Sequence, residues 1–187
     1  MNINYFNSLT QISLNELILK YDENTSLIFL QSFSCAKNKD LEDFLTNPDK
    51  AISFEKRQIA KTYLFLDNDF RVVAYYTIAL NIFSTQNLSK TLIKRLDGID
   101  KNREYIASYL IAQLGKSDTC EFKIGNSILN HAIKNIQRVV DTVGGRFVVI
   151  DAVNNRKIIE FYNSNNFIAI DDCKEMTENI RMYYPFV

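Results

Sequence analysis

Several residue types are scarce in this chain of 187 residues, which has no tryptophan, one histidine, two prolines and five glycines. Its three cysteines, Cys35, Cys120 and Cys173, are widely spaced and form no CxxC pair. With a single histidine they cannot supply the ligand spacing of a common zinc site, so we predict no metal centre. We expect the cysteines to be reduced thiols of a cytosolic protein.

Long apolar runs and an excess of one charge are also missing. No apolar run approaches the roughly 20 residues that span a bilayer, and the start MNINYFNSLT lacks the basic and apolar regions of a signal peptide. The 22 basic and 22 acidic residues cancel, so no whole-molecule field favours nucleic acid or a membrane. Without repeats or long Pro/Gly linkers, the chain is predicted to be one cytosolic domain over residues 1–187, with no membrane partner.

Apolar residues make up 47% of the chain and include 13 Phe and 10 Tyr, which predicts an aromatic-rich core. Residues 1–35 form an N-terminal extension, where the spacing of apolar residues predicts secondary structure least clearly. Leu14, Leu17, Ile18 and Tyr21 have helical spacing, whereas residues 26–33 fit either a strand or a buried turn.

From residue 36 onward the periodicity predicts a regular order of elements. The expected helices are 41–46, 48–59, 89–96, 124–143 and 155–164, and the expected strands are 61–66, 70–83, 104–114, 146–152, 167–170 and 180–186. The apolar middles of strands 70–83 and 104–114 predict cover on both faces. A strand–helix–strand unit over 104–152 favours a right-handed crossover and parallel pairing, and the earlier hairpin adds antiparallel strands. The fold class is therefore mixed α/β.

The stretch 105–129, YIASYLIAQLGKSDTCEFKIGNSIL, has the features of a phosphate-binding element. An apolar strand enters a polar loop with a glycine near each end, and the loop leads into a long amphipathic helix. Amide groups at a helix N-terminus carry partial positive charge and suit a phosphate group.

Two segments resemble the GCN5-related N-acetyltransferase (GNAT) family. They are the strand RVVAYYTIAL at 71–80 and the strand–helix segment VVIDAVNNRKIIEFYNSNNF at 148–167. The resemblance runs from about residue 33 to the end, and it is closest to the branch with the acetyltransferase toxins of bacterial toxin–antitoxin pairs. There, too, a leading F-x-C/S helix pair precedes a G/A-Y-Y strand. It implies a GNAT-like mixed central sheet with splayed parallel strands and helices on both faces.

The resemblance also implies acetyl-coenzyme A as co-substrate. By position, the pantetheine arm would lie along the strand end Ile111, Ala112, Gln113 and Leu114. The family's diphosphate loop matches CEFKIGNS, which assigns Gly125, Asn126 and Ser127 to the diphosphate. Either Asn154 or Asn155 would contact the pantetheine arm, although each is equally suited to cap the following helix.

The loop departs from the family pattern. Cys120 replaces the first glutamine or arginine, Lys123 replaces the first glycine, and Glu121 adds a negative charge. Either the loop takes another path, or cofactor binding is weaker, or Lys116 and Lys123 supply compensating charge. An ordinary strand–loop–helix turn, in which Gly125 only permits close packing, is the alternative.

Tyr162 occupies the position of the family's proton donor for the departing thiolate. It lies four residues after Ile158 on one helical face, so its ring is expected to point toward the sheet. A core tyrosine is the alternative. Glu104 is a candidate base acting through water, or a solvated charge. His131, the single histidine, lies on the long helix and is a weaker candidate.

The segment 90–103 is basic, and in toxin relatives a surface here would hold the backbone of a charged tRNA. Its basic residues are Lys90, Lys94, Arg95, Lys101 and Arg103, against Asp97 and Asp100. The hypothesis is a direct N-acetyltransferase whose acceptor is aminoacyl-tRNA, a small amine or a protein terminus. An antitoxin and a second copy of the chain are candidate partners. The alternative is a degenerate member that keeps the fold as a binding module without catalysis.

Overall fold

The computed structural model describes residues 2–170 and 178–186, so Cys173 lies outside the described part. The chain divides into two compact units: Met1–Ala79 with Ala112–Ile133, and Leu80–Ile111 with Lys134–Val187. We call them unit 1 and unit 2. Strands β3 (Val72–Ser84) and β4 (Tyr105–Lys116) and helix α7 (Gly125–Val143) contribute residues to both units.

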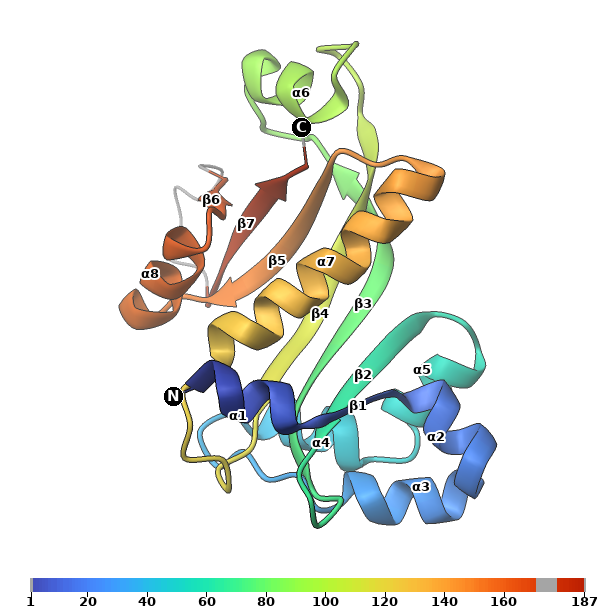
Figure 1. The fold of residues 1–187 in the computed structure, drawn as a ribbon. Coiled ribbons are helices and arrows are strands. Elements are labelled where there is room, and N and C mark those ends of the chain that lie inside the picture. Colours follow the sequence, from blue (N-terminus) through green and yellow to red (C-terminus); the bar gives the residue numbers. More distant parts are fainter. Residues whose placement is uncertain (1, 171–177, 187) are drawn as a thin grey trace. The chain divides into compact units, whose positions relative to one another are not determined.

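Unit 1 begins with elements that the sequence pattern leaves open. Besides its part of α7, unit 1 has the helices α1 (Asn2–Ser8), α2 (Leu14–Tyr21), α3 (Glu23–Leu30), α4 (Lys39–Thr46) and α5 (Ala51–Lys56). Besides its parts of β3 and β4, it has the strands β1 (Thr10–Ser13) and β2 (Ala60–Leu66). Unit 2 contains α6 (Lys90–Asp97), β5 (Phe147–Val153), α8 (Arg156–Ser164), β6 (Ile168–Ala169) and β7 (Asn179–Pro185). The sheet has seven strands in the order β1-β2-β3-β4-β5-β7-β6 (Figure 1).

Helices cover both faces of the sheet in unit 1 because side chains alternate along its strands. On β2, Leu64 and Leu66 join a buried cluster with residues from α2, α3, α4 and α5. Phe65, between them, packs on the other face, with its ring 4.9 Å from Phe6 of α1 and 5.3 Å from His131 of α7. This arrangement confirms the predicted mixed sheet with helices on both sides.

The strand or buried turn expected at 26–33 is wrong, because the structure has helix α3 there. Asp22 explains the helix: its side chain accepts a hydrogen bond from Thr25 N at 2.9 Å, which caps the first turn. The interior Ser26 is fully buried and donates from Oγ to Asp22 O. The capping signal, rather than the apolar run, decides the local structure.

The helix expected at 48–59 is shorter than predicted. A turn with Lys50 N donating to Asn47 O at 3.1 Å precedes α5, so Pro48 lies in the turn. After Lys56 the chain leaves the helix, and Gln58 has φ 58°, which a continuing right-handed helix does not allow. The remaining predicted helices and strands are present, with bounds that differ by a few residues.

Unit 2 contains the predicted parallel pair. β4 and β5 pair at Tyr109↔Val148 and Leu110↔Val149, whereas β5 pairs antiparallel with β7 from Phe147↔Pro185 to Val153↔Asn179. Among the described residues the parallel ladder does not include Ile111 or Ile150. The parallel ladder therefore ends while both strands continue along the chain.

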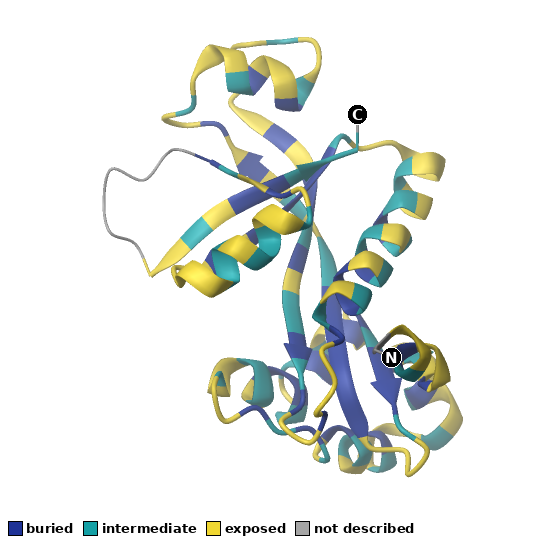
Figure 2. Cartoon of the chain, turned by 60° about the vertical axis from the view of Figure 1, so that its left-hand side comes forward, coloured by how far each residue is buried: buried dark blue, intermediate teal, exposed yellow. Residues whose placement is uncertain are grey.

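The prediction that the apolar middles of β3 and β4 are covered on both faces is correct for only part of each strand. Val72–Thr77 is fully buried, but Leu80 and Ile82 on β3 are 82% and 76% exposed. On β4, Tyr105 is 61% exposed and Ala107 is also exposed, while Ile106 and Ser108 are buried. Figure 2 shows that the strands of the sheet carry both buried and exposed segments. Apolar composition alone does not distinguish a buried strand from one with an uncovered apolar face.

None of the helices in residues 2–170 and 178–186 is long and apolar enough to cross a membrane.

Candidate functional site

The strand–loop–helix segment of unit 1 forms as predicted. β4 ends at Lys116, the loop follows, and α7 begins at Gly125. The first intrahelical hydrogen bond runs from Ile128 N to Ile124 O at 3.0 Å, so the preceding first-turn amides have no acceptor within the helix. Gly125 places no side chain over this helix end. A 19-residue helix gives its N-terminus the partial positive charge that favours an anion.

Hydrogen bonds to the rest of unit 1 fix the first half of the loop. Ser117 N donates to Val73 O at 2.8 Å and Asp118 N to Ser34 O at 2.9 Å, while the Asp118 carboxylate accepts from Ala36 N at 2.6 Å. Lys116 Nζ donates to the carbonyl groups of Ser117 and Cys120. The ammonium group of Lys116 thus stabilises the loop itself, whereas Lys123 is exposed.

The strand end assigned to the pantetheine arm is accessible in part. In unit 1, Ala112 is exposed and Gln113 and Leu114 are half-buried. Ile111, which belongs to unit 2, is buried, and it lies just beyond the last residue pair of the parallel ladder. Backbone groups beyond that pair are the ones that the sequence resemblance predicts to contact the cofactor, and this contact stays a prediction.

Tyr162 lies in unit 2 on α8, within a row of aromatic rings. Its ring is 5.0 Å from that of Phe161 and 5.4 Å from that of Phe167, whose ring is in turn 5.5 Å from that of Tyr184 on β7. Burial raises the pKa of the Tyr162 phenol to about 12, because desolvation disfavours the phenolate. The hydroxyl therefore stays protonated at any physiological pH.

The two asparagines before α8 have different roles. Asn155 is the N-cap, and its side-chain oxygen accepts from Lys157 N at 3.0 Å. Asn154 N donates to Glu178 O at 2.8 Å, which joins the start of α8 to the approach to β7. Capping is thus the observed role of Asn155, and contact of either asparagine with a cofactor stays a prediction.

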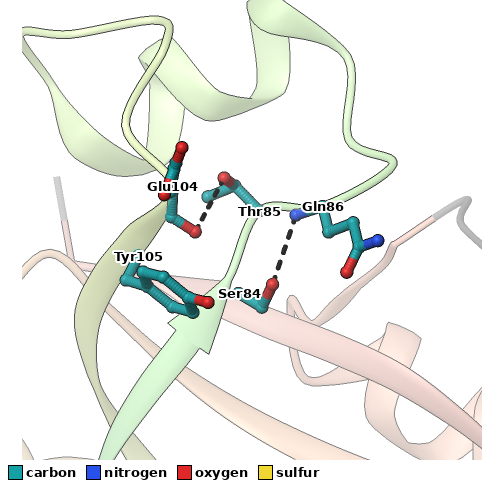
Figure 3. Close-up of a pocket in the computed structure, with 5 residues that line it drawn as sticks. All are labelled: Ser84, Thr85, Gln86, Glu104 and Tyr105. Carbon is teal, nitrogen blue, oxygen red and sulfur yellow. Dashed lines mark hydrogen bonds between the residues drawn. The ribbon is translucent and has the colours of Figure 1, made fainter.

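Glu104 borders a small hollow in unit 2. The hollow, of about 300 Å³, is lined by Ser84, Thr85, Gln86, Glu104 and Tyr105 (Figure 3). The Thr85 hydroxyl donates to Glu104 O at 3.0 Å, so the residue after β3 is hydrogen-bonded to the residue before β4. The Glu104 side chain is exposed, which agrees with a solvated charge.

His131 belongs to the aromatic layer of unit 1. Its Nδ1 is 2.9 Å from the hydroxyl of Tyr76, a fully buried residue of β3, and its ring packs edge-on against Phe65. These contacts give His131 a packing role between α7 and strands β2 and β3.

A second hollow in unit 2, of about 600 Å³, collects cationic side chains. It is lined by Lys90, Thr91, Lys94, Arg95, Gly98, Lys101 and Arg146. Among the described residues, none of its four cations from segment 90–101 has an ion pair, while Arg103 outside it pairs with Asp97 at 2.7 Å. Hydrogen bonds from neighbouring backbone amides, chiefly that of Asp100, lower the pKa of Asp97. We call this hollow the cationic hollow, after the five cationic side chains that line it: Lys90, Lys94, Arg95, Lys101 and Arg146.

Sequence reasoning missed Arg146, which completes the cationic hollow. It comes just before β5, and its Nε donates to Leu96 O at 3.1 Å, across 50 positions of the chain. No local pattern signals this contact.

The predicted residues thus fall into two groups. Unit 1 holds Ala112, Gln113, Leu114, Lys123, Gly125, Asn126 and Ser127, and unit 2 holds Ile111, Asn154, Asn155 and Tyr162. No group of three or more His, Cys, Asp or Glu side chains in the described ranges is placed to hold a metal ion.

No protein-family model and no curated protein matches the chain significantly. Solved structures do. AtaT complexed with acetyl-methionyl-tRNAfMet is 22% identical, with 95% of this chain and 94% of that chain covered and a TM-score of 0.68. AtaTR bound with acetyl-coenzyme A is 22% identical, over 96% and 94% of the two chains, with a TM-score of 0.67. A tyrosine-to-phenylalanine mutant of KacT is 21% identical, over 95% of each chain, with a TM-score of 0.70.

The likeness extends over nearly the whole of both chains, and it includes the mixed sheet described above. At these identities the shared property is the fold. The chain therefore has the GNAT fold, the fold of the family that its sequence resembles.

Proposed function

We propose that this chain is an acetyl-coenzyme A-dependent N-acetyltransferase that transfers the acetyl group directly to an amine. The observation that carries the proposal is the β4–loop–α7 segment, in which a partly accessible strand end leads to a 19-residue helix that begins at Gly125. It stands in a fold whose solved examples include a complex with acetyl-coenzyme A.

In this proposal the cofactor uses backbone groups more than side chains. The amide-like pantetheine arm would pair with the backbone of the β4 end, which offers the hydrogen bonds of an unpaired strand edge. The diphosphate would accept hydrogen bonds from the first turn of α7. Lys123 is exposed and supplies a positive charge two residues before the start of α7, opposed by the exposed Glu121.

The transfer step needs an unprotonated amine and stabilisation of the departing sulfur. The amine nitrogen attacks the thioester carbon, a C–N bond forms, and the C–S bond breaks to release the coenzyme A thiolate. Tyr162 is proposed to donate a hydrogen bond to that sulfur. Its pKa of about 12 exceeds the value near 8.5 of a free thiol, so it acts by stabilising growing negative charge and not as a strong acid.

We propose aminoacyl-tRNA as the acceptor class. AtaT has been solved with acetyl-methionyl-tRNAfMet, and the cationic hollow offers this chain a place for phosphate groups despite its zero net charge. A small amine or a protein terminus is the alternative acceptor. AtaT has also been solved with the C-terminus of its antitoxin AtaR, which makes an antitoxin a proposed partner here.

A binding module without catalysis is the second candidate function, and the loop favours it. Cys120 is 2% exposed and Glu121 is exposed, so the side chains at these two positions provide no positive charge for a diphosphate.

Isothermal titration of the full chain with acetyl-coenzyme A tests the proposal. We expect saturable binding, with Gly125→Glu weakening it at least tenfold because a carboxylate would stand at the helix N-terminus. Gly144→Ala, at the other end of α7 with open space around it, is the matched control and should bind normally. Absence of binding by the native chain at millimolar cofactor would refute the proposal. Binding without acetylation of any amine or charged tRNA would favour the second candidate.

A further inference from the structure

Tyr105, the first residue of β4, presents an uncovered aromatic ring in unit 2. It is 61% exposed, and it lines the hollow of about 300 Å³ described above, which we call the Tyr105 hollow. Figure 3 shows the ring beside the end of β3, with its hydroxyl directed toward Ser84, while Gln86 lies on the other side of Ser84. An exposed aromatic face beside a hollow offers a stacking surface for another planar group.

The other side chains that line the Tyr105 hollow are polar. In the described ranges 2–170 and 178–186, the side chains of Gln86 and Glu104 have no hydrogen bond or ion pair within the chain. An amide and a carboxylate can accept hydrogen bonds from the amino groups of bases, whereas the negative charge of Glu104 disfavours a phosphate group. The Tyr105 hollow therefore suits an uncharged planar group with hydrogen-bond donors, which is the chemistry of a nucleobase.

The Tyr105 hollow and the cationic hollow belong to the same excursion of the chain, between β3 and β4 in unit 2. Helix α6, which lines the cationic hollow, lies just beyond the end of β3 and the start of β4 (Figure 1). The buried Thr85 donates from its hydroxyl to Arg103 O, and the Arg103 guanidinium pairs with Asp97, the last residue of α6, at 2.7 Å. These contacts connect the two hollows, so a site for a base and a site for phosphate groups lie at the same end of unit 2.

We propose that the Tyr105 hollow binds one unpaired base of the acceptor RNA, which stacks on the Tyr105 ring while neighbouring phosphate groups bind in the cationic hollow. The inference rests on the proposed aminoacyl-tRNA acceptor, and it names single-stranded RNA as the part that is recognised. The bases of a duplex are already stacked on one another, whereas unpaired bases are free to stack on aromatic side chains. The volume of the Tyr105 hollow, at the lower end of the range for ligand sites, suits a single base.

Two labelled hairpin RNAs test the inference by fluorescence anisotropy. One has a single-stranded 3′ extension, and the other is the same hairpin with a blunt end. We expect the native chain to bind the extended hairpin about tenfold more tightly, the size expected for one stacked base. Tyr105→Ala should remove this preference and leave the affinity for the blunt hairpin unchanged. Tyr105→Phe keeps the ring, so its affinity for the extended hairpin should stay within about threefold of the native value.

Phe70→Ala is the matched control. Phe70 is 55% exposed in unit 1 and lines neither hollow, so this variant removes an aromatic ring of similar exposure and should keep the preference for the extended hairpin. Lys90→Glu/Lys94→Glu should weaken the binding of both hairpins alike, because phosphate contacts do not distinguish paired from unpaired bases. Thermal unfolding of each variant confirms that it is folded before titration.

The outcomes separate this inference from the proposed function. Equal affinities of the native chain for the two hairpins, or a preference that Tyr105→Ala retains, would overturn the base site and leave the proposed acceptor class standing. If the native chain binds neither hairpin, the tRNA acceptor fails together with the base site. Binding of acetyl-coenzyme A is measured separately by calorimetry, so acetyl transfer to another amine is tested independently of both results.

Discussion

Tyr162 shows how an environment can prepare a side chain for chemistry without a charged partner. Aromatic rings surround it, and the pKa is raised through desolvation alone. A neutral phenol is a hydrogen-bond donor, which is what a developing thiolate needs. The same burial would suit a purely structural tyrosine, so a kinetic measurement has to separate the two roles.

Replacing Tyr162 by phenylalanine keeps the ring packing and removes the donor. We expect kcat to fall about 100-fold, a typical loss when one hydrogen-bond donor to a developing negative charge is removed, with the Kd for acetyl-coenzyme A unchanged. Steady-state kinetics combined with calorimetry provide both values. Unaltered kcat would assign Tyr162 to the core.

The same variant tests the pKa through stability. A phenol whose folded pKa is raised holds its proton more tightly in the folded chain than in the unfolded one. Its stabilising contribution is complete below pH 10 and is lost as pH rises from 10 toward 12. A pKa that rises from 10 to about 12 on folding corresponds to about 3 kcal/mol of stability.

Urea unfolding between pH 9 and pH 12 should therefore show a steeper loss of stability for the native chain than for Tyr162→Phe. Comparing the two proteins cancels the titration of the other tyrosines. Parallel curves would show that Tyr162 is solvated in the folded chain.

Among the elements, α6 depends most clearly on its two ends. Ser89 Oγ accepts from Leu92 N at 3.2 Å, and Gly98 ends the helix with φ 88°, its N–H donating to Lys94 O at 2.8 Å. Arg146 reaches the same end from β5. A Cβ at Gly98 would lie 2.7 Å from the Arg146 guanidinium carbon. The backbone conformation thus favours glycine, and a Cβ here would displace the Arg146 guanidinium group.

Gly98→Ala should cost more than an ordinary glycine replacement. The left-handed backbone costs about 1–2 kcal/mol for a residue with a Cβ, and displacing Arg146 from Leu96 O adds about 1 kcal/mol. Gly144→Ala is the matched control, because Gly144 has φ 93° but open space around it, so it incurs only the first cost. Equal losses of urea stability in the two variants would show that the Arg146 contact contributes nothing.

For the whole molecule, zero net charge conceals a local concentration of cations. Four basic residues of segment 90–101 and Arg146 line one hollow, and the ion pair of Arg103 with Asp97 uses one acid of this segment. Nucleic-acid binding responds to such a local field and not to the total charge.

Charge reversal in the cationic hollow should weaken tRNA binding strongly. For Lys90→Glu/Lys94→Glu we expect the slope of log Kobs against log salt to become about one to two units shallower, since each lost phosphate contact removes about 0.7–0.9. Lys20→Glu/Lys37→Glu changes the net charge equally from exposed positions of unit 1 and is the matched control. Fluorescence titration with labelled charged tRNA provides both slopes, and equal effects of the two double variants would remove the hollow from RNA binding.

Long helices and strands, which neighbouring residues specify, were predicted from the sequence better than short elements. The hairpin, α6, α7 and α8 follow from apolar periodicity, and the caps Asn38, Ser89 and Asn155 mark the starts of their helices. The sequence also predicted the strand–loop–helix order of the candidate cofactor segment at 105–129. The sequence missed α1 and β1, and it misread α3, because short elements carry too few periods to distinguish their type.

The sequence by itself determined the order of strands and helices from α4 onward, the GNAT resemblance and the glycine at which α7 begins. These are properties of neighbouring residues, set by periodicity and by hydrogen bonds that close within a turn. Only the tertiary structure decided that Tyr5 packs on the loop, that Arg146 completes the cationic hollow, and that β3 and β4 leave apolar residues uncovered. Each of these depends on segments far apart in the chain, whose packing no local pattern encodes.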